Sequence, residues 1–236
     1  MARLDGIDHF VVLMLENRSF DSLFGGLYPG RPDFNGLTGS ESNPAPAGGT
    51  FSVWSDGSGD LCLPDPDPGE LFDDINQQLF GSLLPQGTPT MSGFAVNYAK
   101  NGGDPKNVIH YYQLAQVPAL CALARSYAVC DEWYASAPCQ TWPNRFFVHA
   151  GTANGYENNS PAHFPYMMHT VFNDLEGVAP EDWKIYYHDF PHSMVLSKLW
   201  YHLDHFKTFS DFLEDARTAQ LPSYAFIEPR YFADVN

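Results

Sequence analysis

The chain has 236 residues, of which 44% are hydrophobic and 15% aromatic, enough to bury a sizeable core in one large or two small domains. Its 28 acidic and 12 basic residues give a net charge of −16, which argues against a broad polyanion-binding surface and against nucleic acid as a partner. A phosphorylated substrate stays compatible, because a few residues and a metal can reverse the local potential of an acidic protein.

The sequence shows no transmembrane segment and no leader peptide. The apolar stretch Phe10–Leu15 near the N-terminus is too short to span a bilayer and has no cationic lead or cleavage site. We therefore expect a cytoplasmic protein, or a secreted one from which a leader was removed.

The four cysteines have no CxxC spacing, which disfavours a zinc ribbon: Cys62, Cys121, Cys130 and Cys139. We expect free, mostly buried thiols. A disulfide between Cys130 and Cys139 is the alternative for an exported protein.

The first predicted element is a strand over Asp8–Leu15 (DHFVVLML). This run is nearly all apolar, as is typical of a strand buried on both faces of a parallel sheet. The polar segment Glu16–Asp21 (ENRSFD) follows where the strand ends, which is where open α/β sheets place their ligands. Residues 28–69 are dense in Pro, Gly, Ser and Asp, and predict a long irregular insertion.

The middle of the chain contains two predicted helices. A short one is expected over Asp73–Leu84, and another over Gln116–Ala128, which has helical apolar spacing and a Pro in its first turn. Val129–Tyr134 is expected to be a short strand or a connection. The polar segment Ser136–Arg145 indicates turns before a helix that begins within Phe146–Ala150.

The C-terminal third alternates strands and helices. Trp183–Tyr187 (WKIYY) and Ser223–Ile227 (SYAFI) have strand composition, whereas Ser193–His202 and Thr208–Ala219 are expected to be helical. Strands that alternate with helices indicate an α/β sheet, here with inserted loops.

Three of the predicted strands end in polar residues, namely Glu16-Asn17, His188-Asp189 and Glu228. Each taken singly is explained by solvation of a strand end. Together they favour a site at one edge of the sheet, because the carboxyl ends of parallel strands meet there.

Glu16 and Asn17 both carry oxygen donors, so they could bind the same hard divalent cation. The alternative for Asn17 is a turn or a helix cap. The segment Thr141–Arg145 (TWPNR) adds a hydroxyl, an amide and a guanidinium. A threonine hydroxyl is a poor nucleophile until a metal or base activates it, and here a metal would have to do so. Arg145 could hold a phosphate through two parallel hydrogen bonds, with a structural role as the alternative.

His188 could donate a proton or a hydrogen bond to a phosphoryl oxygen, with packing or capping as the alternative. His202 and His205 lie three residues apart with Asp204 between them. The sequence shows no third ligand beside them, so we interpret this pair as part of a solvated helix face.

These motifs resemble the phosphoesterase family that contains bacterial and plant non-haemolytic phospholipases C and a group of acid phosphatases. The opening IDHFVVLMLENRSFDSLFG is similar to the family's signature. Four further similar blocks follow in the family's order: QVPALCALARSYAVCDEWYASAP, TWPNRFFVHAGT, IYYHDFPHSM and LPSYAFIEPRYF.

The resemblance implies an alkaline-phosphatase-like α/β/α sandwich, of which residues 1–236 would be the N-terminal portion of a single catalytic domain. It implies that Glu16, Asn17 and Thr141 bind a metal and that Thr141 attacks phosphorus, which forms a phosphothreonine intermediate that water hydrolyses. His188 would contact the phosphoryl group. The expected substrate-binding residues are Asn144, Arg145 and Glu70, the last standing where many members have a histidine.

The family continues beyond the IEPRYF block with an Asp/His-Pro element and a DEHGG-like acidic segment, whereas this chain stops at Asn236. We therefore expect a fragment whose remaining metal ligands lie outside it. The expected metal is Ca²⁺, Mg²⁺ or Mn²⁺, or Zn²⁺ if a histidine joins the site.

The expected partner is a phospholipid or a small phosphate ester, with transient contact to a membrane surface. Phospholipase C-type cleavage is the first hypothesis for the activity. The alternatives are an acid phosphatase and a non-catalytic fragment or pseudoenzyme that binds phosphate or lipid.

Overall fold

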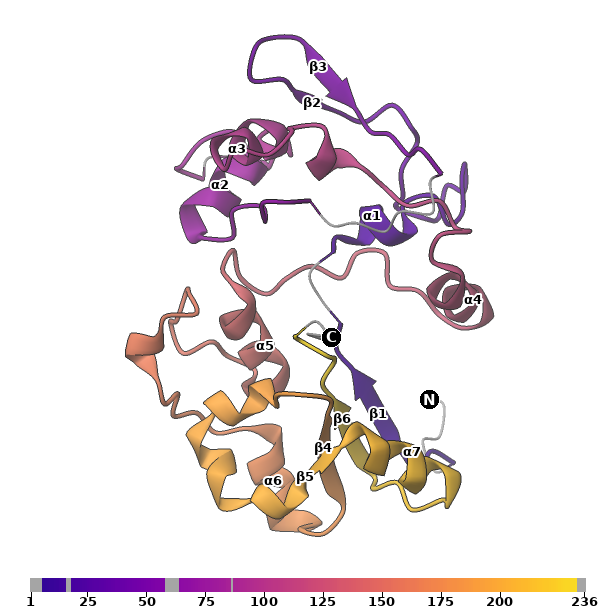
Figure 1. Ribbon diagram of the computed structural model, residues 1–236, viewed down its shortest axis with the longest axis vertical. Coiled ribbons are helices and arrows are strands. Elements are labelled where there is room, and N and C mark those ends of the chain that lie inside the picture. Colours follow the sequence, from indigo (N-terminus) through magenta and orange to yellow (C-terminus); the bar gives the residue numbers. More distant parts are fainter. Residues whose placement is uncertain (1–5, 16–17, 58–63, 86, 233–236) are drawn as a thin grey trace. The chain divides into compact units, whose positions relative to one another are not determined.

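The computed structural model describes residues 6–15, 18–57, 64–85 and 87–232. The chain divides into two compact units. Unit 1 comprises Met1–Glu16 and Arg145–Asn236, and unit 2 comprises Asn17–Asn144. In Figure 1, unit 1 carries the strands labelled β1, β4, β5 and β6, and unit 2 carries the hairpin labelled β2 and β3.

Unit 1 contains a parallel sheet of four strands in the order β1-β6-β4-β5. Helix α5 (Thr141–Ala150) begins in unit 2 and continues into unit 1. The remaining elements of unit 1 are β1 (Phe10–Leu13), η2 (Pro161–His163), α6 (Val171–Val178), β4 (Trp183–Tyr187), η3 (His192–Val195), η4 (Ser197–Tyr201), η5 (Leu203–His205), β5 (Phe206–Thr208), α7 (Phe209–Arg217) and β6 (Tyr224–Ile227).

Helices pack on both faces of this sheet, because successive side chains of a strand point to opposite faces. On one face Trp183 of β4 packs against Phe172 of α6, with their ring centroids 5.0 Å apart. On the other face Tyr186 of β4 packs with Phe209 and Phe212 of α7. These layers and the parallel sheet confirm the predicted α/β class.

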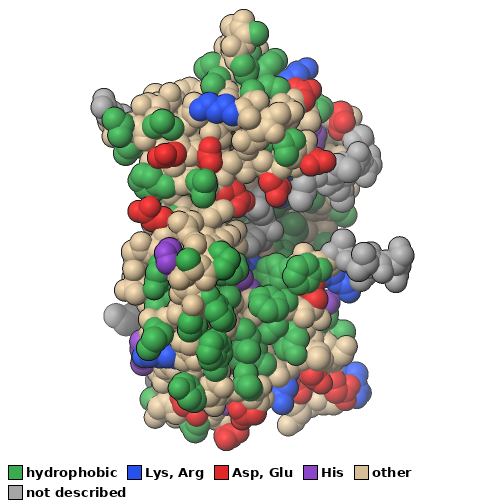
Figure 2. Space-filling model, turned by 60° about the vertical axis from the view of Figure 1, so that its left-hand side comes forward, with side chains coloured by type: hydrophobic (Ala, Val, Ile, Leu, Met, Phe, Trp, Pro, Cys, Tyr) green, Lys and Arg blue, Asp and Glu red, His purple; other side chains and the backbone are tan. Residues whose placement is uncertain are grey.

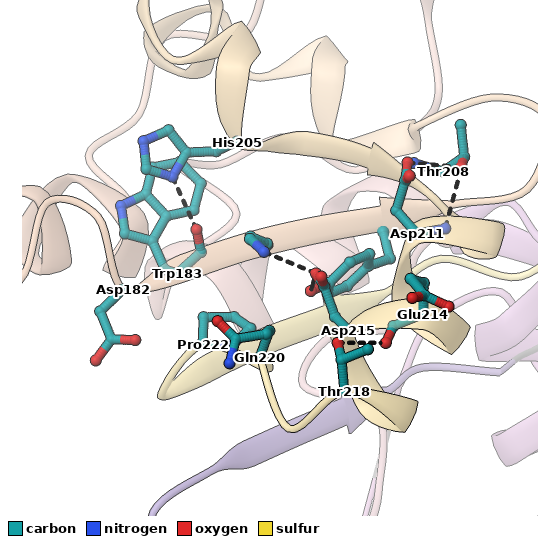
Figure 3. A network of polar contacts seen from close by, with 12 residues as sticks. Asp182, Trp183, His205, Thr208, Asp211, Glu214, Asp215, Thr218, Gln220 and Pro222 are labelled. Atoms are coloured by element: carbon teal, nitrogen blue, oxygen red, sulfur yellow. Dashed lines mark hydrogen bonds and ion pairs between the residues drawn. The ribbon is translucent and has the colours of Figure 1, made fainter.

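Polar contacts fix α7 to its face of the sheet. The carboxylate of Asp215 accepts hydrogen bonds from the Tyr186 hydroxyl at 2.6 Å and from the Lys184 ammonium at 2.7 Å (Figure 3). Burial and the Asp215 carboxylate raise the pKa of Tyr186 well above its ordinary value. Thr208 caps the helix, since its hydroxyl accepts from the backbone N–H of Asp211 while the Asp211 side chain accepts from Thr208.

The strand register brings the polar strand ends to one edge of the sheet. Leu13 of β1 pairs with Ile227 of β6, which in turn pairs with Tyr186 of β4. His188 and Glu228 therefore follow neighbouring parallel strands and lie within one residue of the same level. The sequence-based expectation of a shared edge holds for these two residues.

The prediction that β1 is buried on both faces is wrong. Phe10, Val11 and Leu13 are 52%, 44% and 53% exposed, and Val12 is half-buried. In the described part of the chain β1 is an edge strand that pairs with β6 alone. An apolar sequence shows that a strand is suited to burial, but burial itself requires neighbours on both sides.

The segment predicted as a helix over Ser193–His202 is a series of 3-10 turns, η3 and η4, so the α-helix expected there is wrong. The backbone N–H groups of His192 and Ser193 at its start donate to the side chain of Glu228, which fixes where the first turn begins. The strands β4 and β6 and the helix α7 were predicted at nearly their observed positions.

Unit 2 is mainly helical. Its elements are α1 (Phe20–Phe24), β2 (Ser42–Pro44), β3 (Thr50–Ser52), α2 (Phe72–Phe80), α3 (Phe94–Lys100), η1 (Asn107–Ile109) and α4 (Pro118–Ser126). Leu27, Cys121 and Ala124 form a buried cluster that joins the segment after α1 to α4. Asn97 of α3 bonds to Asp74 and Gln78 of α2 and so connects these two helices.

The predicted helices of unit 2 are confirmed as α2 and α4, and α4 has Pro118 at its start as expected. The insertion expected over residues 28–69 is less irregular than predicted, because β2 and β3 form an antiparallel pair within it. Residues 58–63 of the insertion lie outside the described residues. Among the helices of the described ranges, none has the length and apolar character needed to cross a membrane.

Three cysteines fall within the described residues, and all three are free thiols: Cys121 and Cys139 are buried and Cys130 is exposed. The alternative of a Cys130–Cys139 disulfide is therefore wrong for this structure. Cys62 lies outside the described residues.

Candidate active site

Glu228 is the buried polar centre of the sheet edge in unit 1. It directly follows β6 and is fully buried. One carboxyl oxygen accepts a hydrogen bond from the backbone N–H of Ser193 at 2.8 Å, and the other accepts from the N–H of His192 at 2.9 Å and from the Tyr231 hydroxyl at 2.8 Å. These bonds connect the end of β6 to the turn η3.

Asp189, which follows β4 by two residues, organises the backbone beyond β6. Its carboxylate accepts from the backbone N–H groups of Phe190, Tyr231 and Phe232 at distances between 2.7 and 3.2 Å. Desolvation alone would raise the pKa of the Asp189 carboxyl, but these backbone donors outweigh it and hold that pKa below its ordinary value. The polar residues at two strand ends thus orient the two loops that follow them.

A buried cluster near this edge consists of the guanidinium of Arg145 and two imidazole rings. Arg145, His149 and His192 are 0%, 1% and 5% exposed. The Arg145 guanidinium lies over the Tyr231 ring at 5.3 Å, and the His149 ring centroid is 4.6 Å from that of Phe226. Sequence reasoning missed His149 and His192, because nothing in the residues around a single histidine shows that it is buried.

Burial lowers the pKa of His149 to about 3, and the positive charge of Arg145 acts in the same direction. Burial, Arg145 and His149 likewise lower the pKa of His192 to about 3. Both imidazoles are therefore neutral at physiological pH, because burial away from water disfavours the charged form of the ring.

We expect the free energy of unfolding to fall as pH decreases from about 6.5 to about 3. In this window the unfolded chain takes up a proton at each histidine while the folded chain does not. Each of the two histidines therefore lowers the free energy of unfolding by about 1.4 kcal/mol for every pH unit. Denaturant unfolding at a series of pH values measures this slope. His192→Gln should reduce the slope by about one proton, whereas His163→Gln, at an exposed ring, should leave it unchanged; equal slopes in both variants would contradict a buried neutral His192.

Thr141 is the first residue of α5, and the loop before it is held by Asn144. The Asn144 amide donates to the carbonyl groups of Ala137 at 3.1 Å and Cys139 at 2.8 Å, and its oxygen accepts from the Ala137 backbone N–H at 3.2 Å.

The helix α5 begins earlier than predicted. The segment Ser136–Arg145 was expected to precede the helix, but its last five residues, Thr141–Arg145, are part of α5. Pro143 lies within the first turn of α5, where its missing N–H costs no hydrogen bond.

Arg145 connects α5 to the end of β1. Its Nη2 donates to the backbone carbonyl of Met14 at 3.4 Å, two residues before Glu16. This contact shows that Arg145 has a structural role in unit 1. Such a role was the alternative to phosphate binding that the sequence left open.

The other predicted site residues have different surroundings. His188 is exposed, and its ring stacks on Phe209 of α7 with centroids 4.1 Å apart. Glu70 is half-buried in the loop before α2. Glu16 and Asn17 lie outside the described residues. Thr141, Asn144 and Glu70 belong to unit 2, whereas Arg145 and His188 belong to unit 1.

A second polar cluster in unit 1 could hold a metal ion. Glu176, His202 and His205 each offer a donor atom, and these atoms lie within 4.8 Å of one another. The interpretation of His202 and His205 as a solvated face without a third ligand is therefore wrong. Glu176 approaches them from α6, and His205 is buried.

Comparison with known proteins decides the family. The sequence pattern of the Phosphoesterase family matches residues 7–235. The chain belongs to the Phosphoesterase family. The match covers both units and all of the predicted site residues.

Among curated members of similar sequence, non-specific phospholipase C1 of Arabidopsis thaliana is 37% identical over 236 residues, which is 96% of this chain and 43% of that protein. Non-specific phospholipase C6 of the same plant is 36% identical over 94% of the chain and 43% of its own length. Phospholipase C A of Mycobacterium tuberculosis is 28% identical over 78% of the chain and 38% of its own length. The chain thus spans less than half the length of these Phosphoesterase family relatives.

Proposed function

We propose that the intact protein is a phosphoric-ester hydrolase that cleaves phospholipids in the manner of a phospholipase C. The observation that carries the proposal is the position of Thr141 at the N-terminus of a ten-residue helix, in a chain of the Phosphoesterase family. The related proteins from Arabidopsis and Mycobacterium are named as phospholipases C, which favours the same substrate class here.

The helix N-terminus supports Thr141 as the nucleophile. Amide groups of a first helical turn point away from the helix without acceptors inside it, and the helix dipole favours negative charge there. A phosphoryl group beside Thr141 would therefore meet backbone donors as well as the hydroxyl. The hydrogen bonds of Asn144 to the preceding loop would hold that hydroxyl in place, which makes Asn144 a positioning residue.

The proposed reaction has two displacement steps at phosphorus. The Thr141 oxygen forms a bond to phosphorus while the bond to the glycerol oxygen breaks, and the leaving oxygen takes up a proton to give diacylglycerol. Water then attacks phosphorus, the bond to the Thr141 oxygen breaks, and the hydroxyl regains its proton as the phosphorylated head group leaves. His188, at the carboxyl end of β4, would donate a hydrogen bond to a phosphoryl oxygen.

The donor chemistry of the expected ligands fits a hard divalent cation, because Glu16, Asn17 and Thr141 all offer oxygen. When bound, such a cation would lower the pKa of the Thr141 hydroxyl and offset negative charge on the phosphoryl group. The bond from Arg145 to the Met14 carbonyl joins α5 to the backbone that follows β1.

The surface of unit 1 supports a lipid substrate. Several large apolar side chains are exposed there, among them Phe164, Met167, Trp200 and Tyr201. Figure 2 shows hydrophobic side chains gathered over the middle of unit 1, which is drawn in the lower half of that view. Apolar and aromatic side chains of this kind are suited to the interface between water and lipid.

The test is product analysis with the purified full-length protein. Vesicles of phosphatidylcholine should yield diacylglycerol and phosphocholine in equal amounts, without inorganic phosphate. Release of phosphate from simple monoesters, with no cleavage of the phospholipid, would replace this proposal by the acid phosphatase alternative. The absence of both products from the full-length protein would favour a non-catalytic binding protein.

A further inference from the structure

The cluster of Glu176, His202 and His205 has the spacing of a metal site. The carboxylate oxygen Oε2 of Glu176 lies 3.5 Å from Nδ1 of His202 and 3.9 Å from Nε2 of His205. Both distances exceed those of ordinary N–H···O hydrogen bonds, which lie near 2.9 Å. Donors that surround one ion at about 2.1 Å in tetrahedral geometry are roughly 3.4 Å apart. Small side-chain movements would thus bring all three donors onto a common ion.

Hydrogen bonds with Trp183 orient two of these donors, His205 and Glu176. The Nδ1 of His205 donates to the Trp183 carbonyl at 2.8 Å, so Nδ1 carries a proton, and in the neutral ring the lone pair is on Nε2, which faces Glu176. Figure 3 shows the His205 ring lying over the Trp183 ring, at a centroid distance of 3.8 Å. The indole N–H of Trp183 also donates to Oε2 of Glu176 at 3.2 Å. Hydrogen bonds of this kind commonly orient metal-binding histidines and carboxylates.

The His205 side chain is largely buried, and its Nε2 atom faces two carboxylates at distances longer than a hydrogen bond. The His205 side chain is only 9% exposed, and its two facing carboxylate oxygens, from Glu176 and Asp204, lie 3.9 and 3.8 Å away. Glu176 and His202 are partly exposed, with 34% and 20% of their side-chain surface accessible. A metal could enter from solvent and keep a water molecule as its fourth ligand.

We propose that Glu176, His202 and His205 bind a Zn²⁺ ion. Two imidazole nitrogens and one carboxylate oxygen suit zinc, whereas Ca²⁺ and Mg²⁺ prefer sites made of oxygen donors alone. The ion connects α6 to the turn η5, which leads directly into β5, so its role is to stabilise this part of unit 1.

This zinc site is separate from the candidate active site. His205 bonds to Trp183, the first residue of β4, whereas His188 follows the last residue of that strand. The five residues of β4 separate the two positions by roughly 15 Å. The zinc proposal therefore does not depend on the proposed phospholipase activity.

The test is Zn²⁺ binding to the intact, chelator-treated protein, measured by calorimetry and by metal analysis after dialysis. Glu176→Gln keeps the side-chain size and an acceptor for the Trp183 indole, so this variant should fold. We expect it to lose one bound zinc per chain or to bind that zinc on the order of 100-fold more weakly. His202→Asn should behave in the same way, and in both variants zinc should no longer raise the midpoint of thermal unfolding.

His169→Asn is the matched control, because His169 is an exposed histidine paired with one carboxylate, that of Asp174. This variant should bind zinc as the unchanged protein does. Glu16→Gln, at the expected catalytic metal ligand, should also keep the additional zinc. Equal zinc stoichiometry and affinity in the unchanged protein and Glu176→Gln would overturn the proposal, as would a failure of the unchanged protein to bind zinc at all.

Discussion

Replacing Thr141 by valine is expected to lower the turnover of the full-length protein by roughly 10⁴-fold or more, since the variant lacks the attacking oxygen. Valine has nearly the shape of threonine, and Thr141 is only half-buried, so the helix α5 should still form. Release of phosphocholine from phosphatidylcholine vesicles measures the effect, and circular dichroism verifies the fold.

Thr141→Ser is the matched variant, because it restores a hydroxyl at the same position. It should retain measurable turnover and should form the phosphoenzyme that Thr141→Val cannot form. Acid quenching of the reaction with a substrate labelled in its phosphate would trap this species. A valine variant with substantial activity would mean that another residue attacks phosphorus.

Replacing Glu228 by alanine is expected to lower the free energy of unfolding by about 4 kcal/mol. The change removes the acceptor for the backbone N–H groups of His192 and Ser193 and for the Tyr231 hydroxyl, and all of these bonds are at 2.8 to 2.9 Å. Each buried donor left without a partner carries a desolvation penalty, and the missing side chain leaves a cavity. Urea unfolding monitored by tryptophan fluorescence would measure the loss.

Two further variants separate this effect from the loss of a negative charge. Glu228→Gln keeps the volume and one acceptor oxygen, so about half of the loss is expected. Glu214→Ala removes an exposed carboxylate that pairs with Arg217 on α7, and should change the stability by less than about 0.5 kcal/mol. If the two alanine variants were equally stable, Glu228 would not be a structural centre of unit 1.

The sheet edge could be predicted from sequence because its signals are local. β4 and β6 are short segments rich in apolar and aromatic residues, and a polar side chain follows each of them. That His188 and Glu228 lie at the same edge of the sheet was expected from the general rule for parallel sheets, and the pairing of β4 with β6 agrees with it.

The features that sequence reasoning missed depend on distant residues. The 3-10 turns from His192 onward start with N–H groups that bond to Glu228, 35 and 36 residues away. His202 and His205 come near Glu176 because α6 packs beside η4. Propensities and periodicity do not contain such pairings, because tertiary contacts select them.

The exposed edge of β1 has a consequence for how residues 1–236 behave when they are prepared alone. Phe10, Val11 and Leu13 are about half exposed on a strand that has β6 as its partner on one side. Natural edge strands are usually protected from self-pairing by charges, prolines or bulges, and the run FVVL carries no charge and no proline. Two copies could extend each other's sheets through this edge, so concentrated samples should be prone to aggregation. A lysine in place of Val11 would introduce the kind of charge that discourages such pairing.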